Sequence, residues 1–253
     1  CEEGVVAGVF DALPERYQDI PVEDFGEKLI LPGLIDLHVH ASQYAYRGLG
    51  MDMELLDWLE QNAFPEESHF DDPDYARRAY EIFTEQLKYS ATTRACIFAT
   101  IHRPATLMLM EQLERAGLPC FVGKVNMDRN SPDTLRETTE ESLSETRRWL
   151  EESSDFHMVG PILTPRFTPS CTDELMDGLG VLQREFGVAM QSHLSENRSE
   201  IQWVSELCPD THFYGESYSR FGLFGEGCPT VMAHCVWSGE EERRLMKNNG
   251  VFI

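Results

Sequence analysis

The stretch Leu31-Pro32-Gly33-Leu34-Ile35-Asp36-Leu37-His38-Val39-His40 decides the predicted fold of this chain. Its apolar run follows a proline and a glycine, which is typical of the start of a buried strand, and we predict a strand over Gly33–Leu37. His38 and His40 lie where this strand ends, so both imidazole rings project from the same face of an extended chain. Such a pair can share one metal ion, although alternating polar residues also occur on solvated strand faces.

Short apolar runs and amphipathic segments alternate along the rest of the chain. Further strands are predicted at Thr93–Ala99, Cys120–Val125, Val159–Thr164, Val188–Ser192 and Thr230–Ala233, with Val251–Ile253 beginning another. Helices are predicted at Met53–Asn62, Pro73–Tyr89, Thr106–Ala116, Pro132–Glu152, Asp173–Phe186, Arg198–Leu207 and Glu240–Asn248. This alternation is typical of an α/β protein with a parallel sheet.

Two architectures fit the alternation, a doubly wound sheet and an eight-stranded (β/α)8 barrel. No G-x-G-x-x-G turn opens a predicted helix, which disfavours the dinucleotide-binding form of the doubly wound sheet. Gly187 and Gly250 follow helical segments and are predicted to end them. Ser238 and Glu241 have the spacing of a capping box at the start of the last helix.

Composition limits the classes of partner. The 253 residues fit one large domain or two small ones, and 42% are hydrophobic, which is enough for a sizeable core. Lys and Arg number 21 against 44 Asp and Glu, so the net charge of -23 disfavours nucleic acid and anionic membranes as partners. No stretch approaches the roughly 20 apolar residues of a membrane span.

The cysteines point to a reducing compartment. Their number, seven, is odd and no C-x-x-C spacing occurs, which argues against a disulfide framework. Cys96 and Cys120 sit in apolar runs and are predicted to be core thiols. We therefore expect a cytoplasmic protein.

Polar side chains follow several of the predicted strands at their carboxyl ends. The fourth strand leads into Arg166-Phe167, the fifth into His193-Leu194-Ser195-Glu196, and the sixth into His234. In a barrel these ends meet on one face, where active sites lie. Burying such groups without partners costs on the order of several kcal/mol, so core packing does not explain them. The pattern predicts a functional cluster.

Three imidazoles at strand ends suit a zinc ion with water at its open position. Zinc lowers the pKa of bound water from about 15.7 to about 7. Glu196, three residues after His193, is the candidate proton shuttle, and its alternative reading is a first-turn glutamate favoured by the helix dipole. His69, His157 and His212 are predicted to be surface residues.

His102 follows the second strand and is ambiguous. It could line the mouth of the site, but a structural histidine is the favoured interpretation.

The opening stretch resembles the strand-one signature of the amidohydrolase superfamily, metal-dependent hydrolases built on a (β/α)8 barrel. Within it, further segments are similar to the guanine deaminase family, and the resemblance runs from about Leu31 to Ile253. Those segments are His40-Ala41-Ser42-Gln43-Tyr44, Phe98-Ala99-Thr100-Ile101-His102, Val122-Gly123-Lys124-Val125, Thr164-Pro165-Arg166-Phe167 and Gln191-Ser192-His193-Leu194-Ser195-Glu196-Asn197.

The resemblance implies zinc-dependent hydrolysis of guanine to xanthine and ammonia, in purine catabolism, by a homodimer. It implies one zinc ion per subunit on His38, His40 and His193, with a fourth ligand, an aspartate, expected beyond residue 253. Glu196 and His234 are the implied catalytic residues. The implied substrate-binding residues are His40, Ala41, Ser42, Gln43, Arg166, Phe167, His193, Glu196 and His234.

The two ends of the chain predict an incomplete domain. It begins at Cys1 and stops within the apolar run Val251-Phe252-Ile253. We expect residues 1–31 to be the remnant of a small N-terminal β element and residues 32–253 to be a partial barrel with six or seven of eight strands. Such a chain is expected to bind zinc weakly and to turn over little or no substrate by itself.

Three alternatives remain at this point. The first is another aminohydrolase of the superfamily, acting on an adenosine-type or triazine compound. A cyclic-amide hydrolase is disfavoured, because those enzymes resemble this chain at H-x-H but use a carboxylated lysine where Arg166 stands, and Lys124 is on the third strand. The last is a non-catalytic binding or scaffold protein that keeps the barrel fold but not the chemistry.

Overall fold

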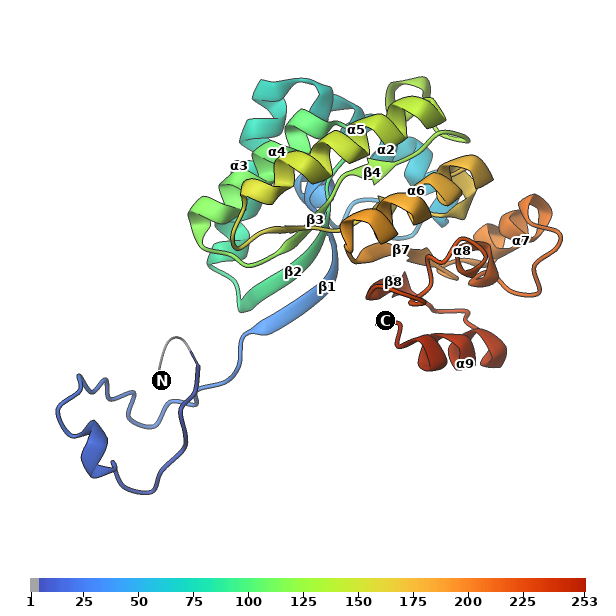
Figure 1. The fold of residues 1–253 in the computed structure, drawn as a ribbon. Helices are drawn as coiled ribbons and strands as arrows, with labels where there is room; N and C mark the ends of the chain where they lie inside the picture. Colours follow the sequence, from blue (N-terminus) through green and yellow to red (C-terminus); the bar gives the residue numbers. More distant parts are fainter. Residues whose placement is uncertain (1–4) are drawn as a thin grey trace. The chain divides into compact units, whose positions relative to one another are not determined.

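Parallel strands alternate with helices from Leu34 to the end of the chain (Figure 1). The computed structural model describes residues 5–253, which divide into two units, one ending at Pro32 and one spanning Gly33–Ile253. The first unit contains the 3-10 helix η1 (Glu15–Tyr17). The β element predicted for residues 1–31 includes positions 1–4, which lie outside the described residues, and it stays a prediction.

All of the strand pairs in the second unit are parallel, as the sequence predicts. β1, β2, β3 and β5 pair in that order, β4 pairs with β6, and β7 pairs with β8. The strands are β1 (Leu34–His40), β2 (Thr92–Phe98), β3 (Phe121–Gly123), β4 (Val125–Asn126), β5 (Gly160–Pro161), β6 (Thr164–Pro165), β7 (Met190–Leu194) and β8 (Thr230–His234). The predicted strand Val251–Ile253 contributes one bridge, between Phe252 and Val231.

Helices occupy the connections between these strands. The α-helices are α1 (Leu55–Trp58), α2 (Phe64–Glu67), α3 (Pro73–Lys88), α4 (Arg103–Ala116), α5 (Thr139–Glu152), α6 (Asp173–Phe186), α7 (Arg198–Leu207), α8 (Glu216–Ser219) and α9 (Glu240–Asn249). Shorter turns are η2 (Ala41–Tyr46), the π-helix η3 (Leu59–Ala63), η4 (Ser68–Asp71), η5 (Asp133–Leu135), η6 (Ser153–Asp155) and η7 (Thr168–Ser170). Figure 1 shows α3, α4 and α5 along one side of β1, β2 and β3. Among the described residues, no helix combines the length and the apolar character needed to cross a membrane.

The third and fourth predicted strands are each divided in two. The third, Cys120–Val125, is interrupted at Lys124, whose fully buried ammonium group donates to Glu137 at 2.8 Å. The fourth, Val159–Thr164, becomes β5 and β6, which both end in proline. Because proline has no N–H to donate to a neighbouring strand, ladder pairing stops there.

Two helix boundaries correct the prediction. The segment predicted as one helix over Pro132–Glu152 starts its α-helix only at Thr139, because Thr138 and Glu141 form a capping box. The capping box predicted for the last helix was wrong. Gly239 is the N-cap of α9 and makes no side-chain cap. Gly187 and Gly250 end their helices with positive φ values of 64° and 69°, as predicted.

The core lies between the strands and the surrounding helices. It is a continuous cluster of fully or almost fully buried side chains that includes Ile97 on β2, Leu109 on α4, Trp149 on α5 and Leu179 on α6. The thiols of Cys96 and Cys120 are buried and free, as predicted. Because these side chains pack the helices against the strands, they fix the positions of the strand ends.

One buried hydroxyl group joins the ends of two strands. Tyr218 on α8 is fully buried, and its hydroxyl donates to the carbonyl of His193 at 2.8 Å. It also accepts from the backbone N–H of Thr168 at 3.1 Å and lies 2.9 Å from the hydroxyl of Ser192. The segment that follows β6 is therefore tied to the end of β7.

Replacing Tyr218 with phenylalanine should lower the free energy of unfolding by about 1–3 kcal/mol, because buried polar groups lose their partner. Urea denaturation monitored by fluorescence measures this change. Tyr89→Phe is the control, since the Tyr89 residue is 78% exposed. Equal stabilities of the two variants would show that the buried hydroxyl contributes nothing.

Candidate functional site

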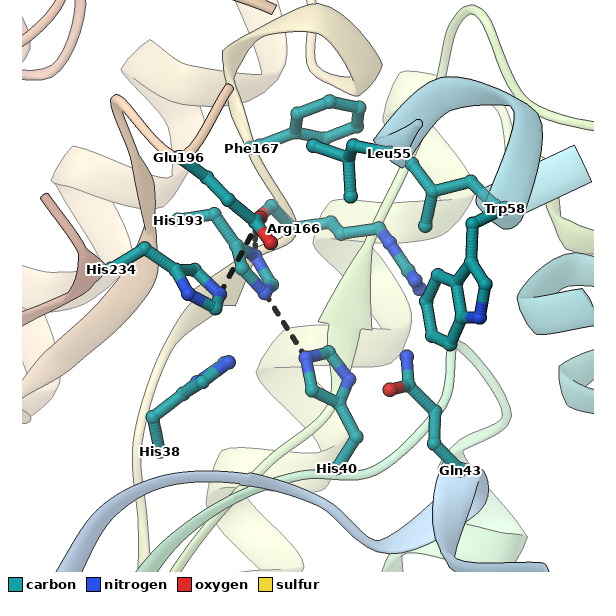
Figure 2. A pocket seen from close by; sticks show the side chains of 11 residues that line it. His38, His40, Gln43, Leu55, Trp58, Arg166, Phe167, His193, Glu196 and His234 are labelled. Carbon is teal, nitrogen blue, oxygen red and sulfur yellow. Dashed lines mark hydrogen bonds and ion pairs between the residues drawn. The ribbon is translucent and has the colours of Figure 1, made fainter. Parts of the chain in front are cut away.

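Three histidines from two strands meet at one point. His38 and His40 end β1 and His193 lies on β7, and their ligating nitrogens all lie within 4.8 Å of one another. The Nε2 atoms of His40 and His193 face each other at 3.0 Å (Figure 2). The structure therefore brings together the three residues that the sequence proposes as metal ligands.

The protonation states of these rings suit a metal ion. The Nδ1–H group of His193 donates to the carbonyl of Arg166 at 2.6 Å, which leaves the Nε2 lone pair directed at the cluster. Burial lowers the pKa of His38 to about 3, with the nearby His234 and Arg166 adding to the effect. Burial and the neighbouring histidines also hold the pKa values of His40 and His193 well below their usual range. Neutral imidazoles at neutral pH are the form that binds a metal.

The donor set suits a zinc ion. Among the described residues, the cluster offers three neutral imidazoles, a ligand type that zinc commonly takes. The two Nε2 atoms are 3.0 Å apart, close enough for both rings to bind one cation.

Phe98 forms an apolar wall for the cluster. It lies on β2, is fully buried, and its ring centroid is 4.6 Å from that of His40, 4.7 Å from His193 and 5.0 Å from His38. The sequence did not single out Phe98 by itself, because a phenylalanine in a buried strand looks like ordinary core. Its role follows from the register, which pairs it with His40 across β1 and β2.

The cluster forms one end of a cavity of about 210 Å³. This volume is below the roughly 300–1,000 Å³ of sites for drug-sized ligands and suits a smaller molecule. The lining residues are His38, His40, Gln43, Leu55, Trp58, Leu59, Arg166, Phe167, His193, Glu196 and His234. Sequence reasoning missed Leu55, Trp58 and Leu59, because apolar residues at helical spacing are indistinguishable from core.

The segment that provides these apolar residues also corrects a helix prediction. Instead of one helix over Met53–Asn62, the chain forms α1, then the π-helix η3, then α2. The wider π turn lies beside the cavity, where such turns are frequent in functional sites.

The predicted substrate-binding segment 40–43 divides into two pairs. His40 and Gln43 line the cavity. Ala41 and Ser42 are 2% and 1% exposed and do not line it, and the Ser42 hydroxyl donates to the carbonyl of Ala99 at 3.5 Å. A role for these two residues in binding stays a prediction.

Arg166 forms part of the polar wall of the cavity, and Glu67, which does not line the cavity itself, pairs with it from behind. The side chains of Arg166 and Glu67 are 3% and 1% exposed. Nη1 of Arg166 donates to Oε2 of Glu67 at 2.5 Å, and Nη2 donates to Oε1 at 3.1 Å. Gln43 donates to Oε1 of the same carboxylate at 3.2 Å. Glu67 was missed from sequence, because nothing distinguishes it from the other acidic residues of its segment.

Glu196 lies on the opposite side of the cavity beside His234, with 3.4 Å between Oε2 and Nε2 (Figure 2). Burial raises the pKa of Glu196 to about 7, and the nearby carboxylate of Glu200 adds to the effect. Burial lowers the pKa of His234. Because α7 begins at Arg198 after an Asn197 cap, Glu196 precedes the helix, and its reading as a first-turn glutamate is wrong.

The backbone is strained where these two side chains leave the strands. Ser195, His234 and Cys235 have φ values of 49°, 72° and 51°, in the region that favours glycine. Such conformations persist where the surrounding structure holds them and are frequent at functional sites.

The remaining histidines lie outside the cavity. His69, His157 and His212 are exposed, as predicted. His102 is the N-cap residue of α4 without a side-chain cap hydrogen bond, and its Nδ1 lies 3.7 Å from a carboxylate oxygen of Asp71, so its structural interpretation stays a prediction. Lys124 does not line the cavity either and pairs with Glu137.

Comparisons with known proteins agree with this geometry. Residues 29–252 match the Amidohydrolase family. The guanine deaminase of Dictyostelium discoideum is 45% identical over 92% of this chain and 52% of its own length, and that of Homo sapiens is 39% identical over 89% and 50%. The crystal structure of guanine deaminase from C. acetobutylicum, with guanine bound in the active site, superimposes with a TM-score of 0.94 at 48% identity, over 97% of this chain and 58% of that one.

These similarities confirm the predicted amidohydrolase-type α/β fold. The chain spans about half the length of the curated relatives it matches.

One equivalent of zinc should bind to the histidine cluster. The dissociation constant of zinc should stay nearly constant from pH 8 down to about pH 6. The reason is that a lowered pKa keeps the rings neutral at a pH where a free imidazole, with its value of 6.5, begins to protonate. His193→Ala should weaken binding by more than about 100-fold, since losing an outer partner alone costs about 10–100-fold. Calorimetric titration measures both effects, with the exposed His212→Ala as control. Equal affinities of the two variants would contradict the assignment.

Proposed function

The chain belongs to the amidohydrolase family, and from that premise we propose that its protein is a zinc-dependent enzyme that hydrolyses guanine to xanthine and ammonia. The observation that carries the proposal is one cavity that holds a three-histidine cluster, the buried cation Arg166 and the carboxyl group of Glu196. The guanine deaminase from C. acetobutylicum holds guanine in its active site, which supports the same substrate class here.

The metal would be held by His38, His40 and His193, the three residues whose ligating nitrogens converge. A zinc ion, when bound, lowers the pKa of water to about 7 and so makes a nucleophile available at neutral pH.

Substrate orientation is assigned to Arg166, Gln43 and Phe167. Guanine is a flat aromatic base with a carbonyl group and ring nitrogens on its edge. The guanidinium and amide groups can hydrogen-bond to that edge, while Phe167, which is 4% exposed, covers an aromatic face. Trp58 and Leu55 extend the apolar lining on the side of Arg166 (Figure 2).

Glu196 is assigned the proton transfers. Its carboxylate takes a proton from the attacking water as the bond from oxygen to the amino-bearing ring carbon forms. It delivers that proton to the adjacent ring nitrogen, and then moves the proton of the added hydroxyl group to the amine as the carbonyl forms and the carbon–nitrogen bond breaks. Guanine and water are consumed, xanthine and ammonia are released, and the carboxylate is regenerated. A carboxyl group with a pKa of about 7 is well matched to both directions of transfer.

His234 is assigned a contact to the substrate and to Glu196. Its ring stacks on His193 with centroids 5.4 Å apart and an interplanar angle of 14°. This packing and the 3.4 Å contact to Glu196 set the position of the shuttle.

Guanine incubated with the zinc-loaded full-length protein should give equal amounts of ammonia and xanthine. Glu196→Gln should lower kcat by at least about 100-fold, since positioned general acid–base groups contribute about 10²–10⁴-fold. Glu206→Gln, an exposed change on α7, should keep the wild-type rate. If the wild-type protein binds zinc but does not turn over guanine, guanine is rejected as the substrate and another aromatic amine is favoured. If the wild-type protein binds no zinc, the mechanism is rejected.

The pH dependence of kcat/KM should show an acidic limb with an apparent pKa near 7. The raised pKa keeps Glu196 protonated below that pH, where it cannot accept a proton, so the rate falls about tenfold for each pH unit below 7. Steady-state assays from pH 5 to pH 9 test this. A rate that stays constant down to pH 5 would argue against Glu196 as the base.

A homodimer in the cytoplasm is the further prediction of the family resemblance. Size-exclusion chromatography and cell fractionation test these two properties separately.

A further inference from the structure

Glu67 is a buried carboxylate behind the cavity wall, in contact with two lining residues, and the reaction assigns it no step. It ends α2 and is 1% exposed. One of its oxygens accepts from Arg166 alone, and the other accepts from both Arg166 and Gln43. The two side chains assigned to the substrate edge are thus held by one acid.

The acid determines which way the Gln43 amide faces. An ionised carboxylate can only accept hydrogen bonds, so Gln43 must turn its NH₂ group toward Glu67. Figure 2 shows the amide nitrogen on the side of Arg166 and the amide oxygen turned toward His40. Without Glu67 the two ends of the amide, which are nearly equal in size, could exchange places.

The same carboxylate fixes the guanidinium group. Arg166 uses both of its Nη atoms on Glu67, which holds the planar group in one orientation and leaves its other N–H bonds as donors. The cavity wall therefore presents N–H donors of Arg166 next to the carbonyl acceptor of Gln43.

This order of donor and acceptor matches a lactam, in which a ring carbonyl accepts and the adjacent ring N–H donates. An amidine edge, as in a 6-aminopurine, has the reverse order, because its amino group donates and its ring nitrogen accepts. Bound in the same pose, it would set donor against donor. A site built to hydrogen-bond one pattern discriminates strongly against the other.

We propose that Glu67 is a positioning residue that sets the donor and acceptor order of Arg166 and Gln43, and so makes the cavity selective for purines with a lactam edge. The inference deepens the proposed function and rests on it. A purely structural role, in which the ion pair only holds α2 against β6, predicts lower stability with unchanged selectivity.

The test compares the affinities of hypoxanthine and adenine for the zinc-loaded full-length protein by calorimetry. Hypoxanthine has the lactam edge and lacks the amino group that would be hydrolysed, so binding is measured without turnover. The wild type should prefer hypoxanthine. Glu67→Gln should lose at least about tenfold of that preference and should raise the KM for guanine more than it lowers kcat.

Two further variants separate positioning from stability. Glu67→Asp keeps the charge beside Arg166 but shortens the side chain, so its preference should fall between those of the wild type and Glu67→Gln. Glu137→Gln removes the acid that pairs with the buried Lys124; neither residue lines the cavity, so this variant should keep the wild-type preference.

Each result decides between the two readings. If Glu67→Gln keeps the wild-type preference for hypoxanthine over adenine, the inference is overturned. If Glu67→Gln does not fold, Glu67→Asp takes its place, and an unchanged preference in that variant overturns the inference. A wild type that deaminates guanine while these variants keep its preference leaves the proposed function intact. A wild type that binds neither guanine nor hypoxanthine rejects the proposed function and this inference with it.

Discussion

The hydrogen bond from Nδ1 of His193 to the backbone carbonyl of Arg166, 2.6 Å long, joins the two halves of the site. On one side it fixes the tautomer of the ring, so that Nε2 is an acceptor that faces Nε2 of His40 at 3.0 Å. On the other side it holds the end of β6, from which the guanidinium group of Arg166 extends to Glu67. The Tyr218 hydroxyl supports the same junction from behind. The histidine cluster and the polar wall of the cavity are thus built on one backbone contact.

The carboxyl groups of Glu67, behind the cavity wall, and Glu196, in the cavity, have different surroundings that suit them to different roles. The oxygens of Glu67 are engaged by Arg166 and Gln43, which suits a group that holds its neighbours in place. Glu196 is also largely buried, but its nearest partner is His234, an imidazole with a lowered pKa. Burial therefore raises the pKa of Glu196 to about 7, which suits a group that exchanges protons.

The candidate metal ligands and the candidate proton shuttle could be predicted because they interrupt a pattern. His38, His193 and Glu196 are polar groups at the carboxyl ends of predicted strands, and parallel strands bring such positions to one edge. Phe98 and Glu67 interrupt no pattern, since one sits in an apolar strand and the other among acidic residues. Their parts in the site depend on register and on the path of a connecting segment, which local sequence does not encode.

The sequence by itself determined the order of strands and helices, the parallel sheet and the polar strand ends, because periodicity and local stop signals are properties of neighbouring residues. Only the tertiary structure decided that Trp58 lines the cavity, that Ala41 and Ser42 are buried without lining it, and that Glu67 meets Arg166. The physical reason is distance along the chain. Arg166 and Glu67 are 99 residues apart, and only packing of the whole sheet brings them within hydrogen-bonding reach.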